Sequence, residues 1–155
     1  MNKVFFITIL SFLLDIILSI FIPINTNFFN YFFVISSLII ISELIEDKTV
    51  YYFFVSLISI IYDLFFTSRV GFNLIVFLLC SIFIKNYNIY FKSKNKIMKY
   101  ISFFILYRLI SYFILILTNY YSFNIFSLLK SIYSSILLNL IYVMLINKIF
   151  LQHHK

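Results

Sequence analysis

The sequence predicts an all-α, polytopic integral membrane protein with six transmembrane helices in one bundle. Of its 155 residues, 64% are hydrophobic and only 11% are charged, whereas a soluble domain is about half apolar and about a quarter charged. The apolar residues form long runs separated by short polar links, and a helix needs roughly 20 mostly apolar residues to cross a bilayer. A water-soluble fold of this length could not bury so much apolar surface, so we expect the chain to be embedded in lipid.

Six apolar runs are the expected helices, and they cover residues 4–22, 28–44, 49–66, 71–84, 100–117 and 125–150. The first run stops at Pro23, and the second ends in a charged cluster that begins at Glu43. The third and fourth runs are separated by a short break before Gly71, which is the only glycine of the chain. Every other link is short except the lysine-rich segment 85–99, so we expect one domain, residues 1–155, with a basic loop at 85–99.

The positive charges indicate how the bundle is oriented. The net charge is +7, but the lysines lie beside or between apolar runs rather than on a soluble element, which argues against nucleic-acid binding. Loops rich in lysine and arginine remain in the cytoplasm. With six spans, placing the 85–99 segment inside also places both termini inside. We therefore predict a multi-pass protein of the bacterial inner membrane with cytoplasmic termini and an outer hairpin at residues 63–73.

Polar residues inside the apolar runs recur every three or four positions, so they share helix faces. Hydroxyl and small residues at this spacing let membrane helices approach closely and form hydrogen bonds. The faces are Thr8, Ser11, Asp15 and Ser19; Ser56, Ser59 and Asp63; and Ser127, Ser131, Ser135 and Asn139. We interpret them as inward-facing packing ridges, and a substrate path is the alternative.

Three charges fall at similar depths within the expected helices, namely Asp15, Asp63 and Arg108. A charge at the bilayer centre costs about 2.5–3.5 kcal/mol on insertion scales, so each needs a partner. We therefore expect Arg108 to pair with Asp63, Asp15 or both, with Arg69 capping from the outer side. Such pairing would fix the register of the helices more than it would add stability.

The sequence contains no strong catalytic, cofactor-binding or metal-binding pattern. The histidines are confined to the tail at His153 and His154, and the single cysteine, Cys80, lies inside an apolar run. No serine, histidine and acid share a depth, and no glycine-rich loop could hold a phosphate. We therefore expect neither an enzyme nor a cofactor.

The segments Tyr62-Asp63-Leu64-Phe65 and Val70-Gly71-Phe72-Asn73 carry a resemblance. A hydrophobic-Asp-hydrophobic motif ends one helix, a short turn follows, and a hydrophobic residue and glycine open the next helix. This pattern resembles the family of the rod-shape-determining protein MreD. The chain length, the six runs and the basic fourth link agree with the family. A further glycine or small residue is common before the aspartate and in the turn, where this chain has Ser59 and Thr67-Ser68.

The resemblance implies a non-enzymatic membrane subunit of the bacterial cell-elongation machinery, which builds peptidoglycan and sets rod shape. Its implied partners, besides membrane lipid, are the bitopic scaffold MreC, the actin-like MreB, RodA and a penicillin-binding protein. Asp63, Arg69, Gly71 and the neighbouring Asn73 would be determinants of the outer hairpin. The alternative is the substrate-binding subunit of an energy-coupling-factor vitamin transporter, which would need a ligand pocket near the outer surface. A small pore or lipid flippase is a third class.

Overall fold

The computed structural model describes residues 2–21, 31–66, 71–90, 95–118 and 122–150. Within these ranges the chain is entirely helical apart from short connections, which confirms the predicted all-α class. The helices are α1 (Asn2–Phe21), α2 (Phe33–Leu44), α3 (Lys48–Phe66), α4 (Phe72–Tyr90), α5 (Lys96–Leu117) and α6 (Ile125–Phe150). The expected helix at 125–150 has these bounds, and most other predicted ends agree within a few residues.

Two boundary predictions were wrong. The second helix, expected from residue 28, begins only at Phe33, and the described residues Tyr31 and Phe32 before it are not helical. The segment expected to be a basic loop is largely helical, because α4 continues to Tyr90 and α5 begins at Lys96. Lysine and asparagine are tolerated in a helix once it leaves the hydrocarbon, so a polar composition does not mark its end.

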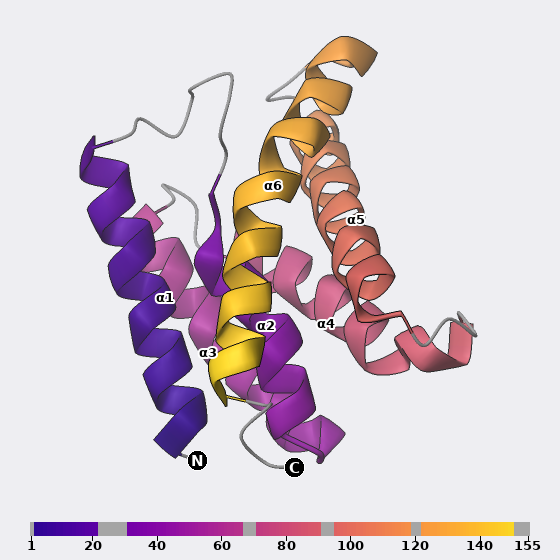
Figure 1. Cartoon of the computed structure of the whole chain (residues 1–155). Helices are drawn as coiled ribbons and strands as arrows, with labels where there is room; N and C mark the ends of the chain where they lie inside the picture. Colours follow the sequence, from indigo (N-terminus) through magenta and orange to yellow (C-terminus); the bar gives the residue numbers. More distant parts are fainter. Residues whose placement is uncertain (1, 22–30, 67–70, 91–94, 119–121, 151–155) are drawn as a thin grey trace.

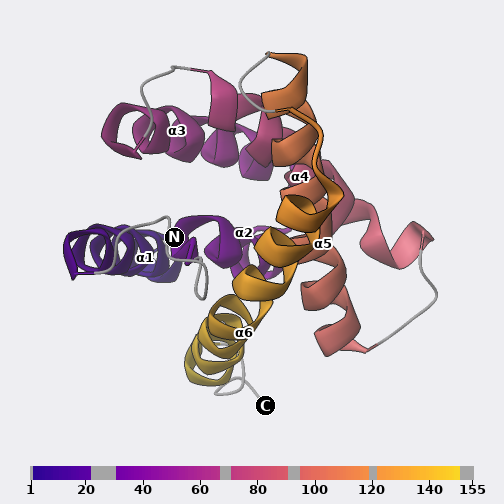
Figure 2. The same ribbon diagram turned by 90° about the horizontal axis from the view of Figure 1, so that it is seen from above.

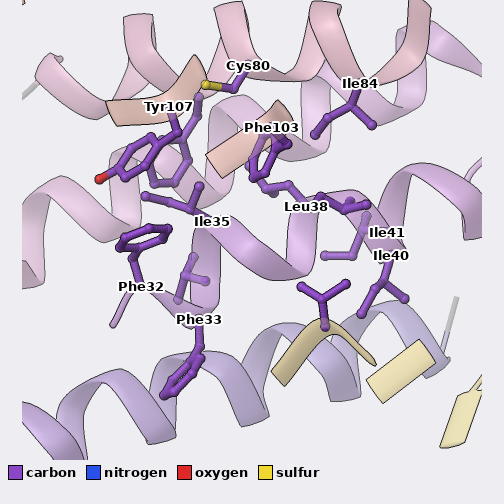
Figure 3. Packing of buried hydrophobic residues seen from close by; sticks show 14 of the residues in the cluster. Phe32, Phe33, Ile35, Leu38, Ile40, Ile41, Cys80, Ile84, Phe103 and Tyr107 are labelled. Atoms are coloured by element: carbon purple, nitrogen blue, oxygen red, sulfur yellow. The ribbon is translucent and has the colours of Figure 1, made fainter. Parts of the chain in front are cut away.

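The short helix α2 lies at the centre of the bundle, with the other helices arranged around it (Figures 1 and 2). It has 12 residues, and every residue from Phe33 to Ser42 is buried. Figure 3 shows its side chains directed to opposite sides, with Leu38 facing Phe103 of α5 and Phe33 on the side away from α4. A helix that is apolar all round is one that other protein elements enclose.

The outer helices expose apolar side chains on the surfaces that face away from α2. Four helices, α1, α3, α5 and α6, are long and apolar enough to cross a membrane. Their exposed side chains include Phe6 and Phe21 of α1, Leu64 of α3, Phe113 of α5 and Phe126 of α6. Contiguous apolar surface of this extent is incompatible with water, so these faces contact membrane lipid.

The helices alternate in direction, so α1 begins and α6 ends at the same end of the bundle (Figure 1). The described part of the chain therefore consists of three helical hairpins, α1–α2, α3–α4 and α5–α6. Packing between hairpins is largely aromatic. Phe5 lies 5.9 Å from Phe54 and Phe12 lies 6.1 Å from Tyr62, measured between ring centroids, and both pairs join α1 to α3.

Candidate functional site

The first polar site is the buried start of α2, which is held by a carboxylate from another helix. Asp15 of α1 is 1% exposed, and its two oxygens accept hydrogen bonds from the backbone N–H groups of Phe33 and Val34 at 2.9 and 3.1 Å. The first N–H groups of a helix have no partner within the helix and carry partial positive charge. Asp15 therefore acts as a cap supplied by the preceding helix, and both of its oxygens are used by those backbone donors.

A second acceptor reaches the same helix start from α6. The side-chain oxygen of Asn139 accepts a hydrogen bond from the backbone N–H of Phe32 at 3.0 Å and another from the Ser36 hydroxyl at 3.0 Å. The Asn139 amide nitrogen donates to the Ser135 carbonyl at 2.6 Å. An unsatisfied backbone donor in hydrocarbon costs several kcal/mol, so α1 and α6 together permit α2 to begin inside the bundle.

The second site is the turn between α3 and α4, and it repeats this arrangement. Asp63 of α3 is fully buried. One of its oxygens accepts from the backbone N–H of Gly71 at 2.7 Å, and the other accepts from the backbone N–H and side-chain amide of Asn73 at 3.2 and 2.7 Å. Gly71 has a φ of +98°, a conformation that residues with a Cβ rarely adopt. Asp63, Gly71 and Asn73, which we call the Asp63 turn, are thus brought together; Arg69 lies outside the described residues.

The third hairpin is closed in a similar way by a neutral group. The Tyr112 hydroxyl of α5 accepts from the backbone N–H of Asn124 at 2.7 Å and donates to its carbonyl at 2.9 Å, just before α6 begins. Each hairpin is therefore closed by a side chain of its first helix that bonds the backbone at the start of its second. No sequence repeat indicates this shared geometry, because the groups differ and their spacing from the turn varies.

Arg108 does not form the expected ion pair with Asp15 or Asp63 among the described residues. Its guanidinium lies over two aromatic rings instead, with its carbon 4.7 Å from the ring centre of Phe32 and 5.5 Å from that of Tyr107. Its Nε is buried and has no hydrogen-bond partner. The prediction was wrong because both carboxylates are taken by backbone donors at helix starts, which a pattern of side chains does not reveal.

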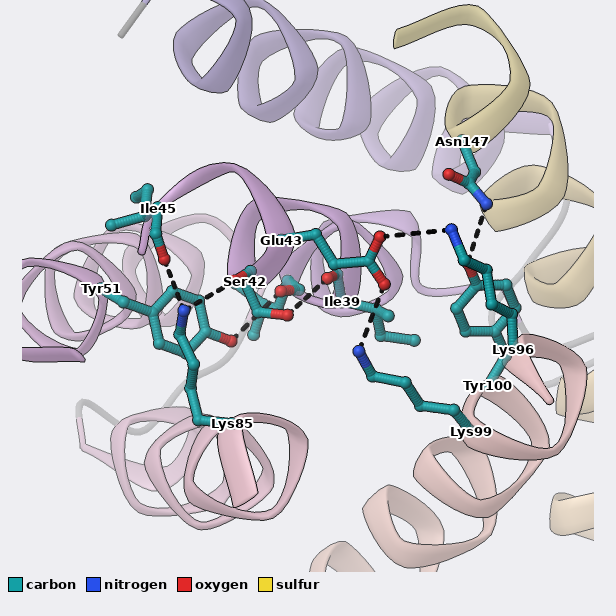
Figure 4. A network of polar contacts seen from close by, with 11 residues as sticks. Ile39, Ser42, Glu43, Ile45, Tyr51, Lys85, Lys96, Lys99, Tyr100 and Asn147 are labelled. Carbon is teal, nitrogen blue, oxygen red and sulfur yellow. Dashed lines mark hydrogen bonds and ion pairs between the residues drawn. The ribbon is translucent and has the colours of Figure 1, made fainter. Parts of the chain in front are cut away.

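The opposite end of α2 is capped from the side of α4 and α5 (Figure 4). The ammonium of Lys85 on α4 donates to the backbone carbonyls of Ser42, at 2.6 Å, and Ile45. Glu43, in the last turn of α2, forms ion pairs with Lys99 at 3.2 Å and Lys96 at 3.8 Å in the first turn of α5. Lys85 thus satisfies carbonyls that the helix end leaves unpaired, and the ion pairs of Glu43 fix α2 against α5.

The predicted polar faces are inward-facing for much of their length, which supports their interpretation as packing ridges. Ser11 of α1 shares a hydrogen bond of 2.6 Å with the Tyr142 hydroxyl of α6. The polar face of α6 is buried only in part, because Ser135 and Asn139 are buried while Ser127 is exposed. The sequence analysis placed Asn139 on a polar face but did not predict that it caps the start of α2. The feature that could have indicated this role is an amide side chain at the end of a row of serines.

The fold and these interior contacts define a multi-pass α-helical membrane protein. No cluster of three or more His, Cys, Asp or Glu side chains that could hold a metal ion occurs in the part of the chain that the structure describes. Comparison with protein families, curated proteins and solved structures gave no match to this chain.

Proposed function

We propose that the protein is a non-enzymatic membrane subunit of the bacterial cell-elongation machinery, acting through protein contacts in the inner membrane. The observation that supports this proposal is the Asp63 turn. Asp63 and Gly71, two positions that carry the resemblance to the MreD family, are eight residues apart in the sequence, yet they share a hydrogen bond, and the neighbouring Asn73 joins the same unit. A motif whose members fix a turn together is more informative than isolated residue matches.

The Asp63 turn gives the hairpin between α3 and α4 a fixed geometry. Its carboxylate holds two backbone donors and an amide, and Gly71 supplies the left-handed backbone conformation. A defined turn at the outer membrane surface is suited to bind a partner that approaches from outside, such as the bitopic scaffold MreC. MreB would meet the cytoplasmic side, where both termini would lie, and RodA and a penicillin-binding protein would contact the bundle within the membrane.

Recovery of partners from the native membrane tests this proposal. The tagged chain is purified in mild detergent, and MreC is measured in the eluate. Gly71→Ala is the informative variant, because a Cβ at this position meets no atom within 4 Å, so the change strains the turn without a steric clash. Asp47→Ala is the matched control, since Asp47 caps α3 at an exposed position away from the turn.

We expect MreC to co-purify with the wild type and with Asp47→Ala, and recovery to fall at least severalfold with Gly71→Ala. Absence of MreC from the wild-type eluate would contradict the proposal. Thermal stabilisation by a vitamin, without MreC recovery, would instead favour the transporter subunit. Ion or lipid flux through reconstituted protein would favour a pore or flippase.

A further inference from the structure

Asp15, Asp63 and Arg108 are the three charged residues at membrane depth. Of these, Arg108 is the one to which the described residues offer no acceptor or counter-charge. The oxygens of Asp15 are taken by the start of α2, and those of Asp63 are taken by the start of α4. Among the described residues, the guanidinium contacts only aromatic rings, and its Nε is buried without an acceptor. A guanidinium at membrane depth without an anion is costly, because arginine does not lose its proton in proteins.

The surroundings of Arg108 are aromatic. The rings of Phe32 and Tyr107 pack on each other, with 4.7 Å between their centroids, and the guanidinium lies beside both of them. Within the described ranges its Nε is buried beside these rings without an acceptor.

We propose that Arg108 anchors a binding site for a small carboxylate with an apolar or aromatic body. The carboxylate accepts from the guanidinium, which can form two parallel hydrogen bonds to it. The apolar body packs against Phe32 and Tyr107. This site goes beyond the proposed scaffold function and does not depend on it.

The depth of Arg108 favours a free carboxylate over a lipid headgroup. Arg108 lies twelve residues after Lys96 and nine before Leu117, the ends of α5, so it is about 18 Å from one end and about 14 Å from the other. Phosphates of headgroups lie outside a hydrocarbon core that is about 30 Å thick. The Nε atom is buried and Arg108 as a whole is half-buried, so the Nε side of the guanidinium faces the bundle.

Ligand-dependent stabilisation tests the site. The full-length protein is placed in phosphatidylcholine nanodiscs and titrated with benzoate, and benzamide is the neutral probe of matched shape. Unfolding is followed through Cys80, the only cysteine, which is fully buried and reacts with a thiol-specific dye when the bundle opens. The variants are Arg108→Gln and Arg108→Lys, and a further arm replaces benzoate with phosphatidylglycerol in the nanodisc.

We expect benzoate to raise the unfolding midpoint and benzamide to leave it unchanged. Arg108→Gln should weaken benzoate binding by about tenfold or more, because it removes at least one charge-assisted hydrogen bond. Arg108→Lys keeps the cation and should bind more weakly than wild type. Equal effects of benzoate and benzamide would overturn the proposal. So would Arg108-dependent stabilisation by phosphatidylglycerol alone, which would make Arg108 a lipid anchor.

Discussion

Replacing Asp15 with alanine is expected to destabilise the bundle by about 1–3 kcal/mol. The carboxylate accepts two backbone hydrogen bonds at the start of α2, and hydrogen bonds to charged groups contribute about 1.5–3 kcal/mol each. Holding a charge at membrane depth costs about 2.5–3.5 kcal/mol, which offsets part of that gain. Asp15→Asn keeps one acceptor oxygen but removes the charge, so its loss of stability should be smaller than that of Asp15→Ala.

Reactivity of Cys80 during denaturant or thermal unfolding in nanodiscs measures this loss without an added label site, because Cys80 is the only cysteine and is buried. Asp47→Ala is the matched control. Asp47 caps α3 through Thr49 and Val50 at an exposed position, where the loss of a cap typically costs about 1 kcal/mol. If Asp15→Ala unfolds within about 0.5 kcal/mol of the wild type, the carboxylate does not cap α2, and our account of the central helix is wrong.

Substitutions at four positions test other contacts by the same Cys80 assay. Arg108→Met should leave the ligand-free protein as stable as wild type or more so, because it removes an uncompensated charge; a loss above about 1 kcal/mol would indicate a structural partner for the guanidinium. Asn139→Leu should cost about 1–3 kcal/mol by leaving the Phe32 N–H unsatisfied, and an unchanged midpoint would refute the second cap. Gly71→Ala should cost about 1–2 kcal/mol for its positive φ alone, so no loss would show that the turn relaxes. Lys85→Met should cost about 1 kcal/mol through the carbonyls at the end of α2, while Lys85→Arg should retain most of that stability; equal losses in both variants would argue against this cap.

Composition and apolar run lengths were sufficient to predict the helical membrane class and most helix ends, because hydrocarbon strongly limits the structures that can span it. The inward orientation of Ser11, Asp15, Ser59 and Asp63 also followed from their spacing. The start of α2 could not be predicted, since residues 28–42 carry no charge and the residue before the helix, Phe32, offers no side-chain cap. The break is fixed by Asp15 and by an amide about a hundred residues further along the chain.

The hydrogen-bond partners of the charged side chains were predicted less accurately than the helices. Sequence reasoning sought a side-chain partner for each charge and therefore paired Arg108 with an aspartate. Backbone N–H groups at helix starts are equally good partners for carboxylates, but they become visible only when the fold places a helix start beside the carboxylate. The Asp63 turn was located correctly, because its members are close in sequence and its glycine is unique.

The second cap on α2 has a consequence for how the protein is made. Asn139, which accepts the N–H of Phe32, belongs to α6, which the ribosome produces after α1 to α5. Until α6 has entered the bilayer, the backbone N–H of Phe32 lacks the Asn139 acceptor, and α2 has no helix packed against its α6 side. The start of α2 is therefore completed only after α6 has been inserted, and nascent chains arrested before residue 139 should be sensitive to membrane proteases even though α1 to α4 have been inserted.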